Sequence, residues 1–219
     1  MKYFHTNERS NEGTMKMSKK VMNYTLVVIS TVVTAFGISL VLLAELGVDP
    51  ISTFLLGGLH FIPIRFGTAS QIFSLTFLVI NYFLNRKFFG VGSLIFSIGC
   101  GYCINLFLAM DAKATLSLQS IPNICIALIG ILIYGCGTGL FLFTKTGMGP
   151  LEGLMFFFST RLNVTIKVTR MTIDGILVVT GILLGGLYGI GTILCIFLVG
   201  PVIELSLKVF TSLSKKVRN

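Results

Sequence analysis

Long apolar stretches separated by short polar segments dominate the sequence. A helix needs about 20 mostly apolar residues to cross a bilayer core of about 30 Å. The pattern predicts six such helices, over about 22–46, 67–84, 91–109, 121–144, 168–187 and 192–207. We therefore expect an all-α membrane protein with six transmembrane helices, preceded by a polar tail over 1–20 and followed by a basic tail over 208–219.

Two glycine–proline breaks end the first and fourth of these helices. They are residues 47–50, Gly-Val-Asp-Pro, and residues 147–150, Gly-Met-Gly-Pro. Glycine permits the bend, and proline is tolerated in the first turn of a helix. Each break precedes a short apolar run, 51–64 or 151–158, that at about 1.5 Å per residue is too short for a full crossing. We expect two short helices that either re-enter the membrane or lie on its surface.

The second half of the chain repeats the first. At an offset of 100, Gly37 falls on Gly137 and Pro50 on Pro150, and after one deletion Asn105 falls on Glu204. Glycine and proline carry the match because they restrict or permit particular backbone geometries. Three crossings per half is an odd number, so the second half would be inverted. The sequence predicts two inverted three-helix repeats, 21–110 and 121–207, joined by a link over 111–120.

Composition and charge support a membrane protein with both termini in the cytoplasm. Only 11% of the 219 residues are charged, against about 25% in soluble domains, and the mean hydropathy is +0.92. With the N-terminus inside, six crossings leave only Arg65 and Lys113, of 17 basic residues, outside. An eight-span arrangement places almost as many basic residues inside, so charge does not separate the two arrangements. The two short apolar runs are too short to cross the membrane, which favours six spans. The net charge of +9 therefore reflects membrane orientation, and we expect no nucleic-acid partner.

The two breaks also provide the first part of a candidate binding site. Non-helical backbone at membrane depth must be buried in protein or face water. Broken helices at corresponding positions of two inverted halves are a sequence signature of a transporter's solute site. The candidate residues at the breaks are Asp49, Pro50, Ser52, Thr53, Gly149, Pro150 and Glu152. The alternative is a pair of tight interfacial loops that bind nothing.

Polar residues within the predicted spans complete the candidate set. Charges there are costly and are usually paired or functional. Arg170 and Asp174 are four apart and share a helix face, either as a local ion pair or as part of the site. Glu204 and Asn105 occupy equivalent positions in the repeat, which favours an interior place for both.

Sequence motifs for catalysis, cofactors and metals are missing. There is no phosphate-binding Gly-x-x-x-x-Gly-Lys-[Ser/Thr] motif and no recognisable nucleophile–base pair. Cys100-x-x-Cys103 has metal-ligand spacing but no second pair, so packing explains it better. We expect neither an enzyme nor a cofactor or metal site.

Several motifs together resemble a bacterial family of integral membrane proteins, the YczE/YyaS/YitT-type proteins. They are Gly47-x-x-Pro50, Gly67-Thr68, Gly101-x-x-x-Asn105, Gly-Ile-Gly-Thr over 189–192, and Gly200-Pro201. The resemblance extends over about 22–207 and implies a bacterial cytoplasmic (inner) membrane. Members of that family often carry an aspartate at the position of Asn105, so the resemblance argues against ion coupling there.

Three functions are compatible with these features. The first is a small secondary transporter or permease for an unidentified small solute or ion, supported by the breaks and the intramembrane acids. The second is a substrate-binding membrane subunit that depends on a partner ATPase. The third is an accessory or regulatory membrane protein, for which the ladder Gly181, Gly185 and Gly189 suits close helix contacts. The expected partners are the lipid bilayer and either a second copy or another membrane subunit.

Overall fold

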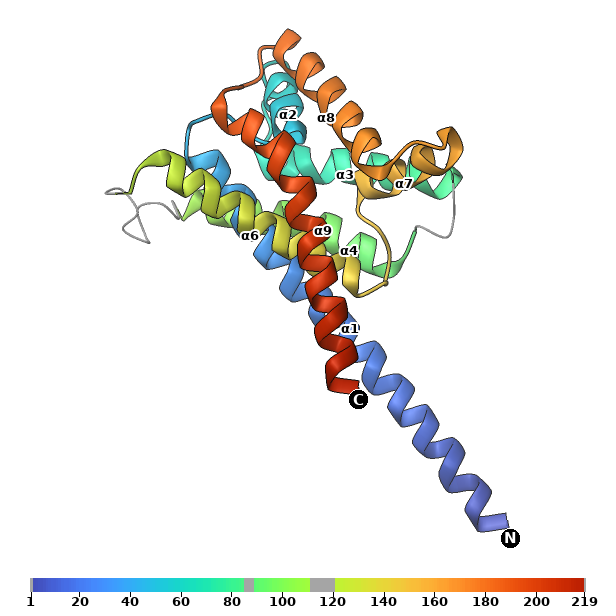
Figure 1. Cartoon of the computed structure of the whole chain (residues 1–219). Coiled ribbons are helices and arrows are strands. Elements are labelled where there is room, and N and C mark those ends of the chain that lie inside the picture. Colours follow the sequence, from blue (N-terminus) through green and yellow to red (C-terminus); the bar gives the residue numbers. More distant parts are fainter. Residues whose placement is uncertain (1, 85–88, 111–120, 219) are drawn as a thin grey trace.

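The computed structural model describes residues 2–84, 89–110 and 121–218, and within them the protein is entirely helical (Figure 1). These residues form eight helices: α1 Lys2–Leu43, α2 Pro50–Leu59, α3 Phe66–Leu84, α4 Val91–Ala109, α6 Asn123–Phe143, α7 Pro150–Leu162, α8 Ile166–Leu183 and α9 Ile190–Arg218. The predicted all-α class is confirmed. The predicted link over 111–120 lies outside the described residues.

Five of the described helices contain segments long and apolar enough to cross a membrane: Lys20–Leu43, Phe66–Leu84, Val91–Ala109, Asn123–Phe143 and Ile190–Ser214. Large apolar side chains such as Phe83 and Leu183 are about four-fifths exposed on the outer surface, as lipid contact requires. The sixth predicted span, over 168–187, corresponds to α8 and is not among the five. Its sequence contains Lys167, Arg170 and Asp174, which lower its hydropathy.

Both terminal helices extend beyond the predicted spans. Helix α1 begins at Lys2 rather than near residue 22, and α9 continues to Arg218 rather than ending near residue 207. The predicted separate tails are therefore helical. A helix that has already nucleated gains one hydrogen bond for each residue it adds, so it extends readily into polar sequence. The first part of α1 projects away from the other helices in Figure 1.

Helices α1 and α6 cross at the centre of the fold through two glycines. A Cβ on Gly37 would lie 2.3 Å from the backbone nitrogen of Tyr134, and one on Gly137 would lie 2.7 Å from that of Thr34. Any side chain at either position would force the two helices apart. Each glycine thus lets its helix contact the backbone of the other.

Each helix break is held by the start of a helix from the other half of the chain. The Gly92 amide of α4 donates to the Thr146 carbonyl at 3.3 Å, and the Gly191 amide of α9 donates to the Leu46 carbonyl at 2.7 Å. Gly47 has φ of 98°, in the left-handed region that favours glycine. These bonds satisfy backbone carbonyls that the breaks free from their helices.

Each break also has a second hydrogen bond, which involves one hydroxyl side chain. Ser93 Oγ donates to the Met148 carbonyl at 2.6 Å, and Thr192 Oγ1 accepts from the Val48 amide at 3.1 Å. The first turns of α4 and α9 therefore hold the starts of α7 and α2 in place.

Candidate functional site

Helix α2 begins with a buried acidic side chain. Asp49 is the N-cap residue and Pro50 occupies the first turn, a combination that favours a helix start. The Asp49 carboxylate accepts from the Ser52 amide at 3.3 Å and from the Ser52 hydroxyl. Only 4% of Asp49 is exposed. The first break thus holds a carboxylate inside the protein through bonds from its own helix.

Helix α7 begins with a buried carboxylate in a different position. Gly149 is its N-cap residue, and Glu152 lies in the first turn. The Glu152 carboxylate lies over Gly149, because a Cβ on that glycine would be 2.1 Å from Oε2. Asp49 and Glu152 therefore place one carboxylate at the start of each short helix, one from the cap position and one from the first turn. Acidic groups are favoured at both places by the helix dipole.

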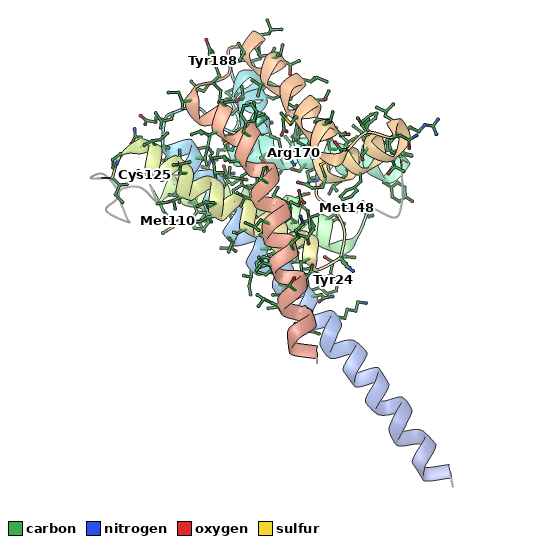
Figure 2. All side chains as sticks on the ribbon, viewed as in Figure 1. Tyr24, Met110, Cys125, Met148, Arg170 and Tyr188 are labelled. Atoms are coloured by element: carbon green, nitrogen blue, oxygen red, sulfur yellow. The ribbon has the colours of Figure 1, made fainter. Side chains whose placement is uncertain are left out.

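The guanidinium of Arg170 joins α8 to the start of α7. Its Nε donates to Asp174 Oδ2 at 2.9 Å, and its Nη1 donates to Glu152 Oε1 at 3.4 Å. All three residues are buried, and Figure 2 shows Arg170 among the helices rather than at an edge. Asp49 is close enough for its charge to interact with Arg170 and Asp174. The predicted Arg170–Asp174 pair is confirmed, and it belongs to a larger charged cluster.

A cavity of about 60 Å³ lies between the two breaks. A water-sized group needs about 10–15 Å³, so the cavity has room for about four to six such groups. Its walls come from both halves of the chain and carry polar and apolar side chains. The lining residues used below are Asp49, Ser52 and Glu152 from the breaks, Thr34, Tyr134 and Thr138 from the crossing helices α1 and α6, Ser97 from α4, and the apolar Ile38, Leu55, Phe66, Phe96 and Ile104.

Three hydroxyls in the cavity wall lack a hydrogen-bond partner in the described part of the protein. They are Thr34 Oγ1, Ser97 Oγ and Thr138 Oγ1, and each belongs to a residue at most 2% exposed. A buried polar group left unsatisfied costs about 1–3 kcal/mol. Polar groups of this kind are normally satisfied by water or a ligand. The cavity therefore has the chemistry to hold a polar occupant.

Residues 21–208 match the model of a family of unknown function, DUF6198. The chain belongs to this family. It is 30% identical to the uncharacterised protein YyaS of Bacillus subtilis over 185 residues, which cover 84% of this chain and 91% of YyaS. It is 23% identical to the uncharacterised membrane protein YczE of the same organism over 189 residues, covering 85% and 86% of the two chains. The predicted relation to YczE and YyaS is confirmed.

A third relative is an uncharacterised protein of Haemophilus influenzae. It is 35% identical over 111 residues, which span 50% of this chain and 51% of the relative. The match thus covers about half the length of each protein. No solved structure matches the chain.

In this DUF6198 protein, three other residues that were predicted for the site lie beside it, and not all of them line the cavity. Pro50 and Pro150 start α2 and α7, and the Pro150 carbonyl accepts from Asn81 Nδ2 at 2.7 Å. Pro150 is also in the cavity wall. Thr53 is fully buried and its hydroxyl donates to the Asp49 carbonyl at 3.2 Å, but it packs toward α8 rather than lining the cavity.

The structure places Asn105 and Glu204 outside the site. Asn105 Oδ1 accepts from the Gly67 amide at 2.8 Å and so satisfies the start of α3. The Glu204 side chain is 67% exposed and pairs with Lys208 at 2.6 Å, so its predicted interior position was wrong. Helix α9 packs on α6 through the face that carries Val199, and Glu204 lies on another face. Two positions that correspond in the sequence repeat therefore differ in how deeply they are buried.

Sequence reasoning missed the cavity's hydroxyls and one buried amide. Thr34, Ser97, Tyr134 and Thr138 were not candidates, nor was Asn81, which is 1% exposed and binds the second break. All five are polar residues inside mainly apolar helices. Polar residues within apolar helices can be seen in the sequence. Serine and threonine there also bond to carbonyls of their own helix, so only the packing shows which of them line a cavity.

Proposed function

We propose that this chain is a small secondary transporter or permease of the bacterial cytoplasmic membrane, with the cavity between its two helix breaks as the solute site. One observation carries the proposal. A single cavity is lined from both breaks, by residues that include Asp49 and Glu152, and three of its lining residues have buried hydroxyls with no partner among the described residues. Discontinuous helices at a repeat interface form the solute sites of many secondary transporters.

Reciprocal contacts support an inverted duplication. Gly37 of α1 contacts the backbone of α6 at Tyr134, and Gly137 of α6 contacts the backbone of α1 at Thr34. The bonds that hold the two breaks are also exchanged between halves, from α4 to the second break and from α9 to the first. A pseudo-two-fold axis through the α1–α6 crossing would relate α1–α4 to α6–α9. Rocking of one half against the other would then open the cavity to each side in turn.

We assign α8 as the sixth crossing, because Arg170 and Asp174 face inward. Arg170 and Asp174 are buried and paired, whereas the exposed face carries Ile176, Val179 and Leu183. A helix of 18 residues is about 27 Å long, close to the thickness of a bilayer core. With six crossings and the basic residues inside, both termini are cytoplasmic.

We assign α2 and α7 as re-entrant helices. Their first turns are buried, since Pro50, Pro150 and Leu151 all contact the interior. The segments where they end are exposed, with Phe61 at 71% and Leu162 at 64%. Each helix would thus enter the protein at its start and emerge at its end. In this proposal the chain binds and moves a solute without altering it chemically.

Thiol labelling from the two sides of the membrane tests the proposal. Ser97→Cys and Thr138→Cys are made in a chain whose five native cysteines are alanine, and a membrane-impermeant methanethiosulfonate is added to right-side-out or inside-out vesicles. Val179→Cys, on the outer apolar face, is the control. We expect both cavity positions to react from both sides and the control from neither.

Three other patterns of labelling argue against a transporter. Reaction of the cavity positions from one side alone would indicate a substrate-binding membrane subunit that depends on a partner ATPase. No reaction from either side, in protein that is purified monodisperse, would indicate a sealed packing defect. Equal reaction of Val179→Cys would show that the cavity positions are no more open to water than the outer face, which contradicts a water-filled solute site.

A further inference from the structure

We infer that the cavity takes a small monovalent organic cation of the protonated-amine class, with Asp49 as its counter-ion. The inference rests on the proposed function, because it names the solute class of the same site. Two independent observations carry it: the balance of charge around the cavity, and the three cavity-lining residues whose buried hydroxyls have no partner among the described residues.

The charged groups around the cavity leave about one negative charge uncompensated. Three carboxylates, of Asp49, Glu152 and Asp174, lie in this region with one guanidinium, of Arg170, which pairs with Glu152 and Asp174. The N-termini of α2 and α7 each contribute roughly half a positive charge. Arg170 and the two helix ends together therefore offset about two of the three carboxylates. A buried charge is costly without a partner, and an occupant with a single positive charge would be that partner.

Asp49 is the carboxylate available to that occupant. Arg170 bonds to both Glu152 and Asp174, whereas among the described residues Asp49 accepts side-chain bonds only from Ser52. Asp49 also lines the cavity. An anionic solute would meet this carboxylate. Two amide donors at the start of α2 are already engaged, Ser52 by the carboxylate and Thr53 by the Asp49 carbonyl.

The remaining wall fits an alkylammonium better than a bare metal ion. The hydroxyls of Thr34, Ser97 and Thr138 can accept N–H bonds. Phe66, Phe96 and Tyr134 add aromatic surface, which attracts organic cations and packs against short alkyl groups. Ca²⁺ would instead require about six to eight oxygen ligands. The volume limits the solute to about four to six non-hydrogen atoms.

Thermal unfolding of the purified full chain tests the solute class. Ethylammonium chloride replaces N-methylglucamine chloride, whose cation is too large for the cavity, at constant ionic strength. We expect a saturable rise in the unfolding midpoint, because a ligand that binds only the folded state stabilises it. N-methylglucamine acetate and ethanol, as the anionic and neutral probes, should give no such rise.

Single-residue variants show whether the rise in the unfolding midpoint comes from binding in the cavity. Asp49→Asn keeps a good helix cap, so the protein should fold, and its apparent affinity for ethylammonium should fall at least about tenfold. Glu204→Gln, at an exposed position outside the cavity, should leave the affinity unchanged. Should Asp49→Asn fail to fold, Thr138→Val tests the same site by removing one hydroxyl at constant volume, and the affinity should again fall.

The inference is overturned if acetate or ethanol stabilises as strongly as ethylammonium, if Asp49→Asn or Thr138→Val binds normally, or if ethylammonium does not shift the midpoint. These results are distinct from failure of the proposed function. A cation that binds but is not moved across vesicles contradicts transport and leaves the solute class intact. Transport of a neutral or anionic solute contradicts the solute class and leaves transport intact.

Discussion

The guanidinium of Arg170 lies 3.4 Å from the carboxylate of Glu152 and connects the second turn of α8 to the start of the short helix α7. The same guanidinium is bonded more closely to Asp174, at 2.9 Å. The contact with Glu152 is therefore the longer of the two, and Glu152 is the partner in the cavity wall. Arg170 thus links the cavity to α8, and a solute that competes for Glu152 would alter that link.

Arg170→Met should strongly destabilise the protein. Loss of the guanidinium leaves Glu152 and Asp174 buried without a cation, and breaking a buried pair in this way costs about 3–5 kcal/mol. Lys208→Met, which breaks the exposed pair with Glu204, should cost at most about 1 kcal/mol. Unfolding midpoints of the two variants in detergent provide the comparison. Equal midpoints would show that the Arg170 cluster contributes no more than a surface pair.

Gly37→Ala and Gly137→Ala should each loosen the central crossing. The added methyl groups would lie 2.3 Å and 2.7 Å from backbone nitrogens of the opposite helix, so α1 and α6 must separate. We expect each change to cost about 1–3 kcal/mol, as overpacking usually does. Gly58→Ala is the matched control, because a Cβ there has nothing within 4 Å and alanine favours a helix. Comparable unfolding midpoints for all three would contradict the close crossing.

Thr138→Val should separate stability from binding. The hydroxyl is buried without a protein partner, so replacing it by a methyl group of similar size should leave stability unchanged or raise it by up to about 2 kcal/mol. The same change should weaken solute binding, because one acceptor is removed from the cavity wall. A lower unfolding midpoint would mean that the hydroxyl has a structural partner, and the assignment of Thr138 to the solute would then be wrong.

Asn105→Asp should be tolerated, whereas Asn105→Leu should not. The role of Asn105 is to accept a bond from the Gly67 amide at the start of α3, and a carboxylate oxygen can accept the same bond. Loss of the acceptor costs about 1–2 kcal/mol at a helix start. Unfolding midpoints distinguish the two variants. If Asp and Leu were equally damaging, then the amide N–H₂ group, which lies 3.4 Å from the Thr68 hydroxyl, would be the essential part.

The sequence predicts the helix breaks well because glycine and proline act locally. Pro50 and Pro150 are at the predicted helix starts, and α4 has the predicted bounds, Val91–Ala109. The Arg170–Asp174 pair follows from a spacing of four residues on one helix. Each of these features depends on residues that are close in the chain.

Features that depend on packing were not predictable in the same way. Helical periodicity shows which residues share a face, but not whether protein or lipid covers that face, so Glu204 was misplaced. The contact from Arg170 to Glu152 joins two helices, and the cavity hydroxyls gain their meaning only when α1, α4 and α6 are brought together. The helical continuation of α1 and α9 through both polar tails was not predicted, because composition does not show where a long helix stops.

Uptake of radiolabelled ethylammonium into proteoliposomes tests the central claim most directly, because it requires both a cation site and movement across the membrane. We predict saturable uptake by the wild-type protein, its loss in Asp49→Asn, and its retention in Glu204→Gln, whose altered side chain lies outside the cavity. Uptake no greater than that of empty liposomes, or uptake that persists in Asp49→Asn, would contradict the claim.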